Sequence, residues 1–192
     1  MKTLAITLSL FLCIVSCTNS PKTSKSSISV YTDQLDIREL SWGASPSLVK
    51  ATETWSLVNN NTNDLTYESI LNDLHCSLVY KFSSGLLSEV YYSFRDDTLY
   101  TLKDFNKLRS ILIEKYGKQT VGDSIYNTNK KEFAAGWENP RTRILLYYFH
   151  NVLNEPTMYL SYKATDKMMQ YVLIYDSILK DMKKKEEIDK TF

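Results

Sequence analysis

Residues 77–94, SLVYKFSSGLLSEVYYSF, contain two runs in which apolar side chains occupy every second position. These positions are Leu78, Tyr80 and Phe82 in the first run, and Val90, Tyr92 and Phe94 in the second. Such alternation is typical of a β-strand with one buried face. Because Ser83-Ser84-Gly85 separates the runs, the stretch predicts a β-hairpin. Its apolar face must be covered by another layer of the fold.

A helix predicted over 102–116 supplies that layer. Thr101 and Asp104 have the spacing of a capping box in its acidic form, and Gly117 stands where a helix commonly ends. The apolar positions between them follow the i, i+3, i+4 spacing of an amphipathic helix. They are Leu102, Phe105, Leu108, Ile111, Leu112 and Tyr116.

Further elements are expected on both sides. Ser45 and Pro46 begin a short helix whose apolar face carries Leu48, Val49 and Thr52. The composition of residues 59–64, NNNTND, predicts a loop. Period-two patterns predict more strands at 65–68, 133–135 and 158–162. The run at 143–149 is apolar on both faces, which predicts a central strand.

We therefore predict an α+β domain over residues 36–165, with an antiparallel sheet covered on one face by helices. The two halves resemble each other as helix-plus-three-strand units in tandem. In this alignment Leu78, Tyr80 and Phe82 correspond to Leu145, Tyr147 and Phe149. Internal duplication and recurrence of a simple motif both explain this similarity.

Residues 166–192 predict a C-terminal amphipathic helix and a charged tail. Met168, Val172, Tyr175, Leu179 and Met182 recur at intervals of four and three residues. Residues 171–175 would also fit a short strand. The sequence leaves open whether this helix docks on the domain or binds a partner.

The N-terminus has the layout of a secretory signal. Lys2 precedes an apolar core, from Leu4 to Val15, that is too short to span a bilayer. Its end, Ile14-Val15-Ser16-Cys17, resembles the lipobox of bacterial lipoproteins. The resemblance implies a signal peptide at 1–16, a lipid on Cys17 and attachment to a membrane of the cell envelope. By resemblance to the sorting rule of enterobacterial lipoproteins, Thr18, which is not Asp, implies the outer membrane facing the periplasm rather than the inner membrane. The Ser, Thr and Lys content of the remainder of 17–35 predicts a flexible tether.

Composition excludes several classes of function. With 23 basic and 22 acidic residues the chain is nearly neutral, which gives no case for nucleic-acid binding. Cys76 would be the only cysteine left beside Cys17 after signal removal, so we expect a buried thiol and no intramolecular disulfide. The two histidines, His75 and His150, have no ligand-spaced neighbours, and no catalytic or cofactor motif is present. No catalytic residue, metal or cofactor is therefore predicted.

The tyrosines suggest a binding surface. Tyr91, Tyr147 and Tyr159 fall on the strand face opposite the apolar alternation. Arg143, together with Arg141, predicts a small basic spot near Tyr147. Exposed Tyr on a sheet can bind proteins, peptides or glycans, whereas half-buried sheet packing is the alternative interpretation.

Several motifs resemble those of an uncharacterised domain of secreted bacterial proteins. The shared patterns are Trp42-Gly43 with Ser45 and Val49, the Leu78–Leu87 hairpin, Lys115-Tyr116-Gly117, and Trp137 with Thr142 and Ile144. More loosely, the helix-plus-three-strand unit is similar to small SmpA-type assembly lipoproteins and to the repeats of beta-lactamase inhibitor protein. The pattern implies no established catalytic residues.

Three hypotheses follow for the function. The leading one is a non-enzymatic envelope lipoprotein that binds another envelope protein or assists assembly. The second is an envelope enzyme that acts on peptidoglycan or other glycans through two facing carboxylates, for instance from residues 96–97 and 132–138. The third is a carrier of a small ligand such as a lipid, held between helix and sheet.

Overall fold

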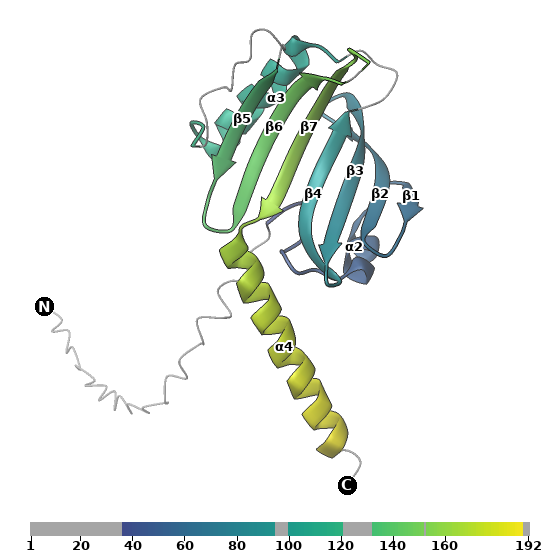
Figure 1. Ribbon diagram of the computed structural model, residues 1–192. Coiled ribbons are helices and arrows are strands. Elements are labelled where there is room, and N and C mark those ends of the chain that lie inside the picture. Colours follow the sequence, from purple (N-terminus) through teal and green to yellow (C-terminus); the bar gives the residue numbers. More distant parts are fainter. Residues whose placement is uncertain (1–35, 95–99, 121–131, 152, 190–192) are drawn as a thin grey trace, which may run out of the picture.

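The computed structural model describes residues 36–94, 100–120, 132–151 and 153–189. Within these residues the chain forms one seven-stranded antiparallel sheet of order β1-β2-β3-β4-β7-β6-β5, together with three helices (Figure 1). The strands are β1 Leu57–Asn60, β2 Asp64–Leu71, β3 Leu74–Ser83, β4 Leu86–Phe94, β5 Phe133–Glu138, β6 Thr142–His150 and β7 Pro156–Ala164. The helices are α2 Pro46–Thr52, α3 Leu102–Tyr116 and α4 Asp166–Asp189. The predicted α+β fold with an antiparallel sheet is confirmed.

The predicted hairpin forms from β3 and β4. The two strands pair with Leu78 opposite Tyr92 and Tyr80 opposite Val90. The turn residues Ser84 and Gly85 both have positive φ, 53° and 76°. Two consecutive left-handed residues define the turn type whose twist matches a two-residue hairpin.

Helix α3 has the predicted bounds and covers β5 and β6 on the face that is turned away from the viewer in Figure 1. At its start the Asp104 carboxylate accepts the Thr101 backbone N–H at 2.8 Å. Phe105, Leu108 and Leu112 are buried. Leu102 and Ile111, predicted on the same buried face, are exposed. They are nine residues apart, which places them at opposite edges of the apolar stripe.

Helix α2 also starts where predicted, with the Ser45 hydroxyl accepting the Leu48 N–H at 3.3 Å and Pro46 as its first residue. The apolar face predicted for α2 included too many residues. Val49 is fully buried, whereas Leu48 is 51% exposed and Thr52 lies at the boundary. In this helix of seven residues, Val49 is the one residue that is buried against the sheet.

The loop predicted at 59–64 was wrong at both ends. Asn59 and Asn60 belong to β1, where they lie opposite Thr66 and Leu65, and Asp64 already belongs to β2. β1 is a short edge strand with all four residues exposed. Edge strands accept polar residues that would be unfavourable inside a sheet, so composition alone did not identify it.

Because β1 adds a strand, the first half contains four strands after α2, and the second half contains three after α3. The three strands β2–β4 nevertheless match β5–β7 in register. Leu78 lies opposite Tyr92, and Leu146 lies opposite Leu160 in the same way. The predicted correspondence of Leu78 with Leu145 was wrong by one position, because it matches a buried leucine with an exposed one.

Helix α4 occupies residues 171–175, so the alternative of a strand there is wrong. Its first turns pack on the segment before α2. Gly43, at φ 87°, approaches so closely that an added Cβ would lie 2.6 Å from Val172 Cγ1. Beyond Val172 the helix extends away from the sheet (Figure 1).

Candidate protein-binding face

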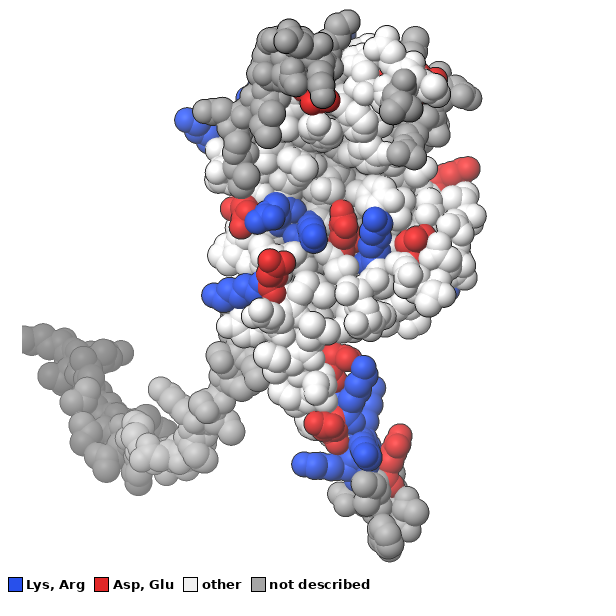
Figure 2. Space-filling view, in the orientation of Figure 1, with Lys and Arg blue, Asp and Glu red and all other residues white. Residues whose placement is uncertain are grey.

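Among the described residues, one face of the sheet has no helix over it, and we call it the open face. It carries the strand residues that alternate with the buried ones, and it is turned toward the viewer in Figures 1 and 2. Two features occupy it, a row of charges and a cluster of aromatic side chains.

The row of charges crosses six strands. Each member lies opposite the next in the strand register, and Figure 2 shows a band of blue and red side chains across the middle of the sheet. Opposite charges at directly opposed positions attract, so most neighbours in the row support each other. In strand order the row is Asp64, Lys81, Glu89, Lys163, Arg143 and Glu138.

The aromatic cluster lies on β4, β7 and β6, beside the row. Tyr91 and Tyr159 have ring centroids 6.2 Å apart, and Phe149 stacks on Tyr159 at 5.9 Å with an interplanar angle of 11°. Tyr147 contacts Phe149 at 5.2 Å. All four side chains are half-buried. The structure therefore brings together the three predicted tyrosines.

Phe149 is a member that the sequence prediction missed. It follows Tyr147 at the period-two spacing of β6, and that spacing alone could have identified it. Burial raises the pKa of Tyr147, and the nearby carboxylate of Glu132 adds to the increase. The cluster thus has an acidic neighbour at the β5 side.

The basic spot predicted from Arg141 and Arg143 does not exist. Arg141 is buried, with its guanidinium donating to both oxygens of Asp36 at 2.6 and 2.7 Å. Because Arg141 precedes β6, the alternation of side chains along the strand does not determine where its side chain lies. Arg143 is exposed on the open face and donates to Glu138 at 2.8 Å. It lies four residues from Tyr147, about 13 Å along the strand.

A partly buried polar cluster lies under the first half of the sheet, and no sequence pattern indicated it. Arg38 donates to both carboxylate oxygens of Glu53, at 3.1 and 3.0 Å, and Tyr80 donates its hydroxyl to the same carboxylate. Burial acts to raise the pKa of Glu53, but the hydrogen bonds from Tyr80 and Arg38 outweigh it and the pKa is lowered. Burial together with Glu53 raises the pKa of Tyr80.

These pKa shifts make the cluster a candidate catalytic site, since perturbed pKa values are frequent at functional sites. Its geometry indicates a structural role. Both oxygens of Glu53 already accept donors from Arg38, and further donors come from Tyr80 and the Thr54 backbone N–H. A carboxylate held ionised with its acceptor sites filled is poorly placed to take up a substrate proton.

Cys76 and the two histidines lie on strands of the sheet. Cys76 is buried in β3, and its thiol donates to the Ser69 carbonyl at 3.6 Å, as expected for a buried cysteine. His75 and His150 lie on β3 and β6. In the described ranges no three His, Cys, Asp or Glu side chains gather as metal ligands would.

The carboxylates predicted for an enzyme come from residues 96–97 and 132–138. Residues 96–97 lie outside the described residues, and Glu138 is ion-paired with Arg143. Cys17, with the predicted signal and tether, also lies outside them. None of the helices in the part of the chain that the structure describes has the length and apolar character needed to cross a membrane.

Comparison with known proteins finds no matching family model, no matching curated protein and no matching solved structure. The resemblances indicated by the motifs remain predictions. The function must therefore be inferred from the geometry of this chain.

Proposed function

We propose that this protein is an envelope lipoprotein, held to a membrane by a lipid on Cys17, whose open face binds another envelope protein. The observation that carries the binding role is the cluster of Tyr91, Tyr159, Phe149 and Tyr147 on the open face. Aromatic side chains are enriched at protein interfaces because they bury a large area with few rotatable bonds.

The chemistry of the face favours a protein partner over the alternatives. The rings contact one another, with Phe149 stacked on Tyr159, so their faces are partly occupied and offer little platform for a sugar ring. The neighbouring row has three basic and three acidic side chains, a balance that does not suit a phosphate backbone. Mixed charges around an aromatic centre fit a protein surface with the complementary pattern.

The proposed anchor sets the distance at which this face would operate. Residues 17–35 separate Cys17 from the first described residue, Asp36. A flexible chain of that length has an average end-to-end distance of about 25 Å. The domain would remain close to the membrane and would meet partners attached to the same membrane.

The proposal extends to the finer architecture of the sheet. We infer that the repeating element is the three-stranded unit, with β1 added to the first copy. The common register of β2–β4 and β5–β7 supports this, with Leu78 equivalent to Leu146 and Tyr92 equivalent to Leu160. Leu78→Ala and Leu146→Ala test the equivalence, because matching positions should respond alike.

Crosslinking in intact cells tests the binding role. The double variant Phe149→Thr/Tyr159→Thr replaces both rings with Thr, which also favours strands. It should lose at least tenfold of the captured partner, since aromatic anchors at interfaces commonly contribute more than about 1.4 kcal/mol. Ile70→Thr is the matched control, because Ile70 is an exposed apolar residue on the same face, in β2, away from the cluster.

Equal capture by wild type and by the double variant would rule out the cluster as the contact. The anchor is tested separately with Cys17→Ala. That variant should leave the membrane fraction on cell fractionation, and its retention there would contradict the lipid anchor.

A further inference from the structure

Helix α4 is longer than its contact with the domain. It has 24 residues, about 36 Å, but of residues 166–187 only Met168 and Val172, near its start, are buried. These two residues meet the segment that carries Trp42 and Gly43. The remaining turns extend past the edge of the domain (Figure 1).

The buried face of α4 continues along this projecting part. Tyr175, Ile178, Leu179 and Met182 follow Met168 and Val172 at helical spacing, so they lie on the same face. Ile178, Leu179 and Met182 are 39%, 37% and 54% exposed. We call Tyr175, Ile178, Leu179 and Met182 the distal stripe. An apolar stripe of this length on a projecting helix indicates a contact with another molecule.

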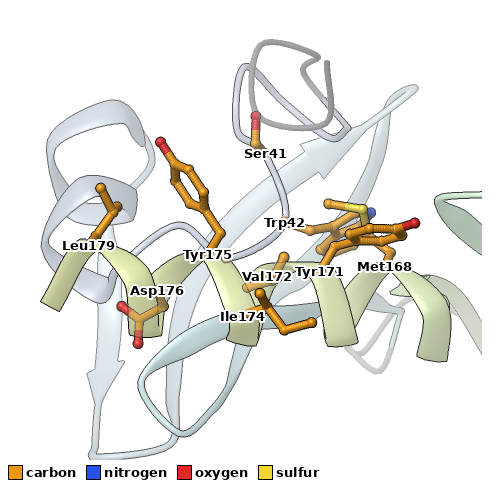
Figure 3. Close-up of a pocket in the computed structure, with 10 residues that line it drawn as sticks. Ser41, Trp42, Met168, Tyr171, Val172, Ile174, Tyr175, Asp176 and Leu179 are labelled. Carbon is orange, nitrogen blue, oxygen red and sulfur yellow. The ribbon is translucent and has the colours of Figure 1, made fainter. Parts of the chain in front are cut away.

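A groove of about 160 Å³ joins the distal stripe to the domain. Apolar side chains dominate its walls, and Figure 3 shows Trp42, Met168 and Tyr171 together near the root of α4, with Tyr175 and Leu179 farther along. Together the groove and the stripe form an elongated apolar surface that is hollowed where α4 meets the Ser41–Gly43 segment. A rod such as a helix fits this shape, whereas a flat bilayer surface would leave the groove unfilled.

The charges beside the stripe identify the occupant. Asp176 and Lys183 are seven residues apart and therefore lie on the same edge of the helix. A two-fold axis midway between them, near Leu179, would bring Asp176 of each copy beside Lys183 of the other. The same axis would place the two distal stripes against each other.

We propose that the distal stripe binds α4 of a second copy of this chain in antiparallel orientation. A parallel pair would instead place Lys183–Lys185 of both copies side by side, which repels. An isologous contact of this kind covers both stripes at once. The inference does not depend on the lipid anchor or on the open face.

The charge balance of the segment favours a second copy over a membrane surface. Residues 176–187 contain four basic and four acidic residues. A helix that lies on an anionic bilayer normally has an excess of Lys and Arg on its polar side. The distal part of α4 lacks this excess.

Sedimentation equilibrium of the full chain carrying Cys17→Ala, over a micromolar to millimolar series, tests the proposal. A monomer–dimer equilibrium is expected. Asp176→Lys and Lys183→Asp should each weaken the dimer about tenfold, because each removes two symmetric ion pairs. The double variant Asp176→Lys/Lys183→Asp exchanges the charges and should return the Kd to within about threefold of wild type.

Lys184→Asp is the matched control. It makes the same change in net charge at the adjacent residue, which faces away from the stripe, and should shift the Kd less than about threefold. Asp176 also pairs with Lys180 of its own helix at 2.7 Å, and only an intermolecular pair explains recovery in the double variant.

A chain that stays monomeric at every concentration would overturn the proposal, as would a dimer that ignores the charge exchange. Vesicles of phosphatidylethanolamine and phosphatidylglycerol test the other occupant. If the chain stays monomeric in sedimentation, binds these vesicles and loses that binding with Leu179→Glu, the distal stripe is a membrane contact and the proposed dimer is wrong.

Discussion

The two halves of the sheet have the same strand frame and different interiors. In both, three antiparallel strands pair in equivalent registers, as Leu78 with Tyr92 and Leu146 with Leu160 show. Beneath the first half lie α2, of seven residues, and the partly buried Arg38–Glu53–Tyr80 cluster. Beneath the second lies α3, of fifteen residues, with an apolar face.

The difference shows that strand register can persist while the covering layer changes. A long helix can bury its half of the sheet with apolar side chains alone. A short helix leaves space that the segment from Asp36 to Ala44 fills, and polar groups in that segment must then find partners. Arg38, held at φ 46°, reaches Glu53 in this way.

The largest expected effect comes from shortening the matched leucines. Leu78 and Leu146 are both fully buried at equivalent positions of β3 and β6. Leu78→Ala and Leu146→Ala should each lower the free energy of unfolding by about 2–5 kcal/mol. Since β4 and β7 join the halves into one sheet, both variants should unfold in a single transition in urea.

Two separate transitions in either variant would contradict a common core. Leu145→Ala serves as the control for the second half, because Leu145 is the adjacent residue on the open face and is 42% exposed. Its replacement should change stability by less than about 1 kcal/mol.

How far the sequence predicted the fold depended on whether the determining contacts were local. The β3–β4 hairpin and α3 were predicted closely because Ser84-Gly85 and the Thr101–Asp104 pair fix them within a few residues. The open-face position of the tyrosines followed from period two alone. The missed β1 is set by its pairing with β2, which no local pattern shows.

The polar cluster could not have been predicted for the same reason. Arg38 and Glu53 are fifteen residues apart, and Tyr80 is a further 27 residues along the chain. The sequence pattern predicts only that Tyr80 is one of the buried positions of an alternating strand. Only the fold brings its hydroxyl to a carboxylate, and only the fold shows that Arg141 is buried against Asp36.

The polar cluster gives the second prediction, which concerns pH. The lowered pKa of Glu53 means that its charged form is favoured in the folded state, against the cost of burial, by Tyr80 and Arg38. That stabilisation is complete above the unfolded value near 4.5 and is lost as the pH falls through the folded value. Glu53→Gln should therefore cost about 1–3 kcal/mol at pH 7 and flatten the acid dependence below about pH 4.5.

Chemical denaturation at a series of pH values measures both effects. The double variant Arg38→Met/Glu53→Gln is the informative control, because it removes the unpaired guanidinium and should recover part of the lost stability. An unchanged pH profile in Glu53→Gln would show that Glu53 does not contribute to acid sensitivity.

The smallest expected effect concerns the ion pair that the second half carries on its surface. Arg143 and Glu138 are joined at 2.8 Å, like the pair of the first half, but the Arg143 side chain is 60% exposed. An exposed pair gains little in water, so Arg143→Ala should change the free energy of unfolding by less than about 0.5 kcal/mol. A loss above about 1 kcal/mol in the same denaturation assay would mean that the row of charges stabilises the sheet. If stability is unchanged and crosslinking to a partner falls, the two ion pairs differ in role as well as in burial, with Arg38–Glu53 stabilising the fold and Arg143 contacting the partner.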